Sequence, residues 1–302
     1  MERVIHRSGL RPFKPKVFSC DGAMFWVTAL MALVAVGSMI TIVVYIIHES
    51  LPILNEQGRS FFTGRDWNVG ETYGALPMVY GSFMVTGLAL ALVLPFALGS
   101  AVFTAEFLSR RVRLLVKSAM ELLAGVPGII YGLIGIAVLA PWVRDTFGIV
   151  DGNTIATAAI LLAVMILPTI ITLSEDALRA VPGEYRDTAL SLGLTKVETV
   201  FRVVFPHALP GIAGAVFLGM GRAMGETVAV MLVIGGIDRI PHPWFNLFSS
   251  GQSIPSKLGR EAAEALGYGL HWSALMGLGL VLFLMVMSFT LAGNLFLRRV
   301  RL

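Results

Sequence analysis

The sequence has little charge and almost no cysteine. Only 14% of its residues are charged, against about 25% in ordinary soluble domains, while 56% are hydrophobic. A water-soluble fold could not bury so much apolar surface, so most of the chain is predicted to lie in lipid. The single cysteine, Cys20, excludes a disulfide within the sequence and a metal cluster built on cysteines.

The sequence also lacks the motifs of an enzyme. It contains no G-x-x-x-x-G-K-[ST] loop for binding phosphates, and its five histidines show no metal-ligand spacing. No Ser-His-Asp or paired-carboxylate arrangement can be argued either. We therefore expect no catalytic residue, metal or cofactor in this chain, and any ATP should be bound by a partner subunit.

Six long apolar segments are present, and each is long enough to cross a hydrocarbon core about 30 Å thick. Five of them carry no charge, and the fifth in order carries two. They are continuous rather than alternating, which favours helices over the strands of a barrel. The sequence therefore predicts an all-α polytopic membrane protein whose six transmembrane helices lie at residues 23–47, 76–105, 122–143, 154–174, 208–237 and 272–297.

Lysine and arginine are unevenly divided between the two sides implied by six crossings. Sixteen lie on the side of the termini and six on the other, so both termini are predicted to be cytoplasmic. The first apolar run is too long for a cleavable signal, and the basic residues before it are better explained by orientation in the lipid bilayer than by nucleic acid. We expect a basic N-terminus with the first helix at 1–47, a periplasmic loop at 48–75 and a permease core at 76–302.

A cytoplasmic loop at residues 175–207, called the coupling loop below, has helical signals of its own. Pro182 suits a first helical position and Gly193 a C-terminal cap, which predicts a short helix over 183–192. Thr195 and Glu198 have capping-box spacing and predict a second helix, which Pro206 should end. Periodicity alone leaves a solvated connector on the membrane surface equally open.

The spacing within the coupling loop resembles the signature of ABC importer permeases, written E-A-A, three residues, G, nine residues, I, one residue, L-P. The matching residues are Asp187, Thr188, Ala189, Gly193, Val203, Phe205 and Pro206. In that family this loop docks into a groove on the ATP-binding subunit. The resemblance therefore implies a docking role for residues 186–193, beginning with Arg186, and a helix-in-groove contact in which Tyr185, Ala189 and Leu192 share a face.

Arg222 and Glu226 are the two charges in the fifth apolar segment, four residues apart. On a continuous helix they would be neighbours, and charges inside a membrane should face each other or a polar cavity. One hypothesis is that Arg222 binds a passing anion while Glu226 partly neutralises it. The alternative is an ion pair that only fixes the packing of the helix.

The segment around this pair, G-x-G-R-A-x-G-E-T, ending at Thr227, resembles phosphate permeases of the PstC type. Further matches are SLPIL (50–54), YGALPMVYGS (73–82), ELLAGVPGIIYG (121–132) and LHWSALMGLGLVLF (270–283). The resemblance implies a MetI-like bundle that imports phosphate across the bacterial inner membrane. It also implies three partners, a PstA-type permease, a PstB-type ATPase dimer and a PstS-type binding protein, and a substrate pathway that includes Arg222, Glu226 and Thr227.

Two other functions remain open from the sequence. A sulfate or molybdate permease has a similar fifth segment but more often continues G-E-F, and an ion-coupled secondary transporter could use Glu226 as its ion carrier. Three further residues are candidates for gating or helix packing, namely Glu121, Pro127 and Gly225. For Glu121, a solvated pair with Lys117, four residues earlier, is the simpler interpretation.

Overall fold

The structure is a computed structural model that describes residues 19–267 and 269–300. The chain forms two compact units, Met1–Tyr45 and Ile46–Leu302. The basic residues expected to orient the N-terminus, Arg3, Arg7, Arg11, Lys14 and Lys16, lie outside the described residues.

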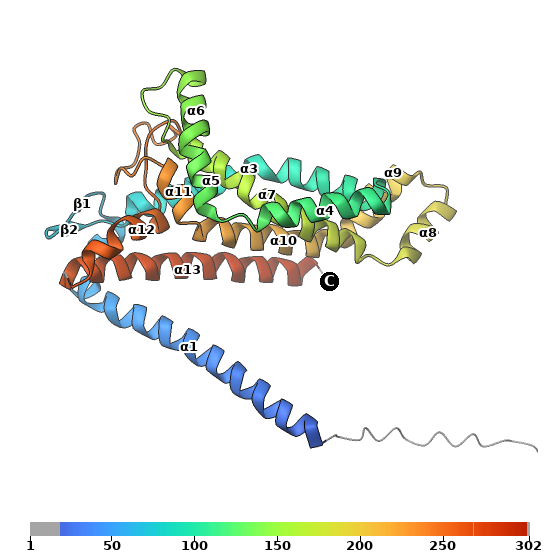
Figure 1. Ribbon diagram of the computed structural model, residues 1–302, viewed down its shortest axis with the longest axis horizontal. Helices are drawn as coiled ribbons and strands as arrows, with labels where there is room; N and C mark the ends of the chain where they lie inside the picture. The colour runs from blue at the N-terminus through green and yellow to red at the C-terminus, as the bar shows by residue number, and fades with distance from the viewer. Residues whose placement is uncertain (1–18, 268, 301–302) are drawn as a thin grey trace, which may run out of the picture. The chain divides into compact units, whose positions relative to one another are not determined.

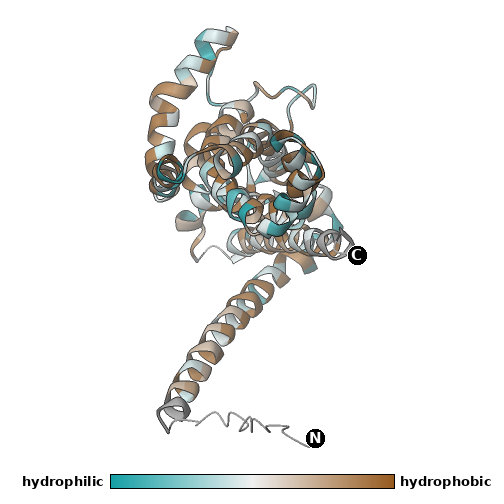
Figure 2. Ribbon diagram, turned by 90° about the vertical axis from the view of Figure 1, so that its right-hand side faces the viewer, coloured by the Kyte–Doolittle hydropathy of each residue, from teal (hydrophilic) through white to brown (hydrophobic). Residues whose placement is uncertain are grey.

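The described part of the first unit is helical and belongs to α1 (Ser19–Gln57), within which the division between the units falls. Hydrophobic residues predominate along α1 in Figure 2. A helix that is apolar on all sides is typical of a membrane span. The predicted first span at 23–47 is therefore part of a longer helix, whose last residues, from Ile46 on, belong to the second unit.

The second unit is a bundle of helices with one small hairpin (Figure 1). In the hairpin, two short antiparallel strands pair Trp67 with Tyr73 and Asn68 with Thr72. After α1 the elements are α2 (Arg59–Thr63), β1 (Trp67–Asn68), β2 (Thr72–Tyr73), α3 (Leu76–Val102), η1 (Phe103–Phe107), α4 (Arg110–Ala124), α5 (Gly128–Ile134), η2 (Gly135–Leu139), α6 (Ala140–Phe147), α7 (Ile155–Arg179), α8 (Gly183–Ser191), α9 (Lys196–Thr199), η3 (Val200–Val204), α10 (Phe205–Gly225), α11 (Val228–Val233), α12 (Ile254–Ala265) and α13 (Gly269–Val300), where η marks a π-helical turn.

Six helical segments in the described residues are long and apolar enough to cross a membrane, which confirms the predicted all-α fold. Four of them agree with the sequence prediction apart from their ends. The third begins later than expected and the fifth ends earlier, and both differences concern the candidate site. The observed segments are Met24–Gln57, Leu76–Phe107, Gly128–Phe147, Ile155–Arg179, Lys196–Gly225 and Gly269–Gly293.

Helix α7 lies at the centre of the second unit. Its buried residues form one apolar core with those of α3, α10 and α11, including Val85, Ile166 and Val230. Glycine allows α10 to approach α7 closely, because a Cβ atom on Gly219 would lie 2.7 Å from Cγ1 of Ile170. The fold therefore gives α7 a fixed position against which the other helices are held.

The two ends of the bundle are built differently. Helices α8 and α9 lie at one end, and α12 and the hairpin lie at the other (Figure 1). At the first end, an ion pair between Arg186 of α8 and Glu106 of η1 joins the segments that follow α7 and α3. In the predicted orientation, residues 106–121 and the coupling loop both lie on the side of the termini, and the pair of Glu106 with Arg186 joins them at this end of the bundle.

Candidate functional site

Two segments predicted to be continuous helices are interrupted, and the interruptions lie against each other. The predicted third span at 122–143 is wrong at its start, because α4 ends at Ala124 and α5 begins at Gly128. The residue before a proline is disfavoured in a helix, so Pro127 explains this break. The predicted fifth span at 208–237 is wrong at its end, because α10 stops at Gly225 and Glu226 is extended, with φ −70° and ψ 118°.

Arg222 reaches from α10 to the first interruption. Its Nη2 donates a hydrogen bond to the carbonyl oxygen of Ala124 at 3.0 Å, and its Nη1 donates to the hydroxyl of Thr169 at 3.4 Å. Ala124 is the last residue of α4, and the carbonyl groups at a helix C-terminus lack partners in the helix and carry partial negative charge. The guanidinium group is therefore held by neutral acceptors at the end of a helix dipole.

Glu226 occupies the second interruption and has different partners. Its Oε1 accepts a hydrogen bond from the backbone N–H of Ala229 at 3.2 Å, in the first turn of α11. The same carboxylate lies against Gly128, where a Cβ atom would be 2.7 Å from Oε1. A negative charge at a helix N-terminus is favourable. Each charge in the fifth segment is thus matched to a helix end of the opposite sign.

The expectation that Arg222 and Glu226 are neighbours on one helical face is wrong. Both lie in the described part of the chain, and no ion pair within 4.0 Å joins them. The physical reason is the end of α10 at Gly225, which removes the four-residue helical repeat on which the expectation depended. Both hypotheses for the pair placed these charges together, so the roles of the two residues have to be argued separately.

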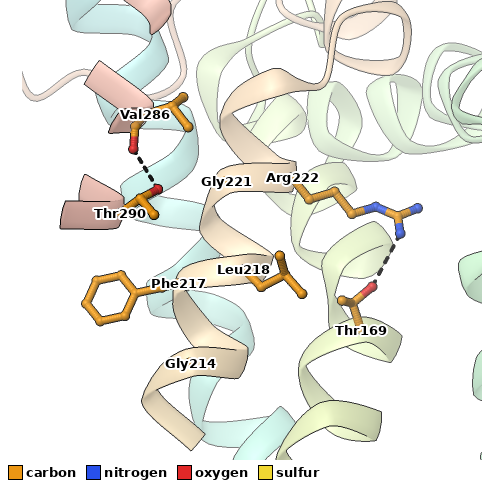
Figure 3. Close-up of a pocket in the computed structure, with 8 residues that line it drawn as sticks. All are labelled: Thr169, Gly214, Phe217, Leu218, Gly221, Arg222, Val286 and Thr290. Atoms are coloured by element: carbon orange, nitrogen blue, oxygen red, sulfur yellow. Dashed lines mark hydrogen bonds between the residues drawn. The ribbon is translucent and has the colours of Figure 1, made fainter. Parts of the chain in front are cut away.

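A cavity of about 630 Å³ lies between α7, α10 and α13, with Arg222 on its wall. Figure 3 shows Arg222 extending from α10 towards Thr169 of α7. The cavity is not enclosed, since Arg222 is exposed in it. Apart from Arg222 and two threonines, the lining is apolar or glycine. The remaining lining residues are Gly214, Phe217, Leu218, Gly221, Val286 and Thr290.

The structure does not place all three predicted pathway residues in this cavity. Glu226 lines a separate, much smaller space of about 10 Å³, and the hydroxyl of Thr227 donates to the carbonyl of Gly225 at 3.3 Å. Sequence reasoning missed Thr169 and the Ala124 carbonyl. A hydroxyl in the apolar fourth segment is a weak signal for Thr169, and only the tertiary structure identifies the carbonyl.

The coupling loop has the predicted local structure from residue 183 to the capping box at Thr195 and Glu198. Helix α8 runs from Gly183 to Ser191, and Gly193 follows it with φ +87°, a conformation that glycine adopts readily. Both hydrogen bonds of the capping box between Thr195 and Glu198 are present. A surface groove of about 650 Å³ follows this loop and is lined by Pro182, Glu184, Tyr185, Thr188, Ala189, Leu192, Leu194 and Val203.

Side chains of α8 divide between this groove and the interior. Leu192 is 76% exposed and Tyr185 is 46% exposed, while Ala189 is buried between them. Arg186 points inward, where it forms an ion pair with Glu106 at 2.6 Å and donates to the carbonyl groups of Val181 and Leu178. Arg186 therefore anchors α8 to the bundle, and the groove residues form the surface that a partner could contact.

Pro206 does not end the helix in which it lies, which corrects the sequence prediction. The chain continues from η3 into α10, and Pro206 occupies the first turn of α10. Proline normally clashes with the carbonyl four residues earlier and removes a hydrogen bond. The wider π-helical turn at Val200–Val204 changes the local pairing just before the proline and lets the helix continue.

Lys117 pairs across helices and not with Glu121 as expected. Its Nζ lies 2.5 Å from Oδ1 of Asp176 in α7, and the hydrogen bond with Asp176 raises the pKa of Lys117. One turn earlier, Arg113 lies 3.6 Å from the buried carboxylate of Glu175. These two ion pairs join α4 to the last turns of α7.

The other two gate candidates, Pro127 and Gly225, border the two interruptions. Pro127 precedes α5, and Gly225 borders open space, since a Cβ atom there would meet nothing within 4 Å. Within residues 19–267 and 269–300, no group of three or more His, Cys, Asp or Glu side chains could hold a metal ion.

The chain resembles known proteins in sequence and in fold. Residues 94–302 match the family described as binding-protein-dependent transport system inner membrane component. The phosphate transport system permease protein PstC of Mesorhizobium japonicum is 36% identical over 290 residues, covering 88% of this chain and 86% of the relative. PstC of Pasteurella multocida is 38% identical over 247 residues, covering 75% and 76%.

Among solved structures, a bacterial ABC transporter involved in the import of alginate superimposes with a TM-score of 0.63 at 13% identity, covering 93% of this chain and 98% of that chain. The inward-facing MetNI methionine ABC transporter gives a TM-score of 0.55 at 18% identity, covering 75% and 94%. At these identities the likeness establishes the fold alone.

Proposed function

The chain belongs to the binding-protein-dependent transport system inner membrane component family, among its PstC phosphate permeases, and we propose from that premise that it conducts inorganic phosphate as half the pore of an ABC importer. It is a multi-pass protein of the inner membrane with a transport role. In this role the chain carries out no catalytic step of its own.

Arg222 in its apolar cavity is the observation that carries this proposal. Its hydrogen-bond partners are a carbonyl and a hydroxyl, so the described contacts leave its positive charge without a carboxylate. A guanidinium group offers planar pairs of donors that match phosphate oxygens. On entering, phosphate would replace the two neutral acceptors of Arg222 with charged oxygens. When phosphate leaves, the Ala124 carbonyl would again accept the hydrogen bond from Arg222.

Glu226 has a separate role in this mechanism. Its carboxylate caps α11 and contacts α5 at Gly128, so it holds the two interruptions together. Thr227, the next residue, belongs to the same interruption. We assign Arg222 to anion binding, and Glu226 and Thr227 to the shape of the pathway.

Importers of this family work with ATPase and substrate-binding partners. For this chain we assign a PstB-type ATPase dimer to the coupling loop, where Tyr185, Ala189 and Leu192 line the groove. A PstA-type permease would complete the pore and a PstS-type protein would deliver phosphate at the other end. Both termini and the coupling loop would then be cytoplasmic, with residues 48–75 periplasmic and 76–302 forming the permease core.

Uptake of labelled phosphate and sulfate in cells that lack their own permeases tests the substrate. We expect phosphate uptake that disappears when the companion ATPase is removed. Uptake of sulfate alone would assign the chain to the sulfate or molybdate permeases, and phosphate uptake that persists without the ATPase would make it a secondary transporter. Either result would overturn the proposal.

Arg222→Gln tests the site itself. We expect it to abolish phosphate uptake while the complex still assembles, and Arg222→Lys to retain part of the activity, since it keeps the charge but not the planar donors. Arg239→Gln is the matched control because Arg239 is an exposed arginine outside the cavity. Failure of assembly with Arg222→Gln would show that the residue serves packing.

A further inference from the structure

The last turn of α7 joins two elements that are far apart in the sequence. On one side, Arg186 of α8 donates a hydrogen bond to the carbonyl of Leu178 at 2.9 Å. On the other side, Asp176, two residues earlier, forms the 2.5 Å ion pair with Lys117 of α4. A displacement of this turn therefore acts on α8 and α4 together.

Helix α4 leads from this junction to the candidate site. Lys117 lies seven residues before Ala124, or about 10 Å along a helix that rises 1.5 Å per residue. At its end, the Ala124 carbonyl accepts the hydrogen bond from Arg222, and the Leu123 carbonyl accepts one from the hydroxyl of Tyr131 at 2.9 Å. The position of α4 along α7 thus sets the position of the oxygen that holds Arg222.

The side-chain contacts of α4 with α7 allow α4 to move with the last turn of α7. The hydrophobic residues of α4 are exposed or half-buried, and none of its residues is buried. Two ion pairs attach it to the last turns of α7, the partly exposed Lys117–Asp176 and that of Arg113 with the buried Glu175, and Met120 packs against the apolar core. A helix that buries none of its residues is less tightly held than one interdigitated in a close-packed core, so it can follow the last turn of α7 when that turn moves.

From this arrangement we infer that Lys117 and Asp176 are positioning residues, whose ion pair carries movement of the coupling loop through α4 to the Arg222 guanidinium. The inference rests on the proposed role of Arg222 in transport. Movement of α8 displaces the last turn of α7, the ion pair moves α4 with it, and the Ala124 carbonyl approaches or leaves Arg222. ATP binding in the partner would thereby control whether Arg222 is free for an anion.

Charge reversal in the full transporter tests this inference. In proteoliposomes, Lys117→Glu and Asp176→Lys should each lower the phosphate imported per ATP hydrolysed by about tenfold, because like charges then face each other. The exchange of both residues, Lys117→Asp with Asp176→Lys, should restore the ratio to within about twofold of wild type, and Lys117→Arg should keep it. Such rescue would not follow from a general loss of folding.

Arg111→Glu is the matched control, since it makes the same charge change at an exposed position of α4. It should leave the ratio unchanged. The inference is wrong if either single reversal keeps the wild-type ratio, if the exchanged pair fails to restore it, or if Arg111→Glu lowers it equally.

A second measurement does not need phosphate and separates this inference from the proposed substrate. Spin labels on cysteines introduced at the exposed positions Leu122 of α4 and Val164 in the middle of α7, with Cys20→Ser, report the position of α4 along α7. Trapping of ATP with vanadate should shift the distance between the labels in wild type and in the exchanged pair, but not in Lys117→Glu. An equal shift in Lys117→Glu would overturn the inference even if phosphate is the substrate.

Discussion

The anchoring of α8 by Arg186 yields a prediction whose size follows from the structure. The Arg186 side chain is 23% exposed and that of its partner Glu106 is 9% exposed. Removing one partner of a buried ion pair costs about 3 to 5 kcal/mol. Because Arg186 keeps some contact with solvent, we expect Arg186→Ala to cost about 2 to 3 kcal/mol, which includes the lost donations to Val181 and Leu178.

Hydrogen exchange of the α8 amides measures this cost locally. If opening of α8 limits exchange, a cost of about 2 to 3 kcal/mol corresponds to exchange about 30- to 150-fold faster across residues 183–193. Arg186→Lys should give a smaller increase, because lysine cannot reach the carboxylate and both carbonyls from one planar group.

Arg202→Ala provides the control for this measurement. Its ion pair with Glu198 is 3.8 Å long and joins two exposed side chains of the same loop, so exchange across residues 183–193 should change by less than about twofold. If Arg186→Ala changes the exchange no more than Arg202→Ala does, Arg186 does not anchor α8, and the reasoning from burial is refuted.

Single positions elsewhere in the chain give three more predictions. Gly193→Val should cost about 1 to 2 kcal/mol from backbone strain alone, since φ is +87° and space is open, and it should lower ATPase coupling; normal coupling would contradict the docking role. Gly128→Ala should lower the melting temperature by displacing Glu226, unlike Gly214→Ala, where a Cβ meets nothing within 4 Å; equal melting temperatures would contradict the contact. Because the hydrogen bond with Asp176 raises the pKa of Lys117, the ion pair should persist through neutral and mildly basic pH and be lost only as the pH rises through that raised pKa. Lys117→His should instead lose coupling near neutral pH, where histidine gives up its charge; a pH-independent ratio in Lys117→His would count against the pair.

The features that depend on local signals could be predicted from the sequence. Hydropathy located six membrane segments, and the cap residues Thr195 and Gly193 located the short helices of the coupling loop. Each of these signals acts within a few residues of the structure it specifies, so no knowledge of the fold was required.

The errors at Arg222 and Arg186 have a common physical origin in contacts between distant segments. The pairing of Arg222 with Glu226 assumed a continuous helix, and the actual partner of Arg222, the Ala124 carbonyl, is 98 residues away. Backbone carbonyl groups carry no sequence signal at all. Arg186 likewise pairs with Glu106, which is 80 residues away. Its side chain therefore points into the bundle and not, as expected, towards a docking partner.

The wrong prediction that Pro206 ends a helix has a different cause, the π-helical turn before it. A proline after a periodic segment is a sound sign that a helix ends. The wider turn at Val200–Val204 relieves the clash on which this rule depends. No residue type in the segment indicates that a π-helical turn will form there.

A map of the assembled transporter with phosphate trapped inside would decide whether Arg222 binds the anion. We expect density for the anion in the cavity between α7, α10 and α13, within hydrogen-bond distance of the Arg222 guanidinium, with the bond to the Ala124 carbonyl broken. Phosphate bound elsewhere, with Arg222 still on that carbonyl, would contradict the proposed role of Arg222.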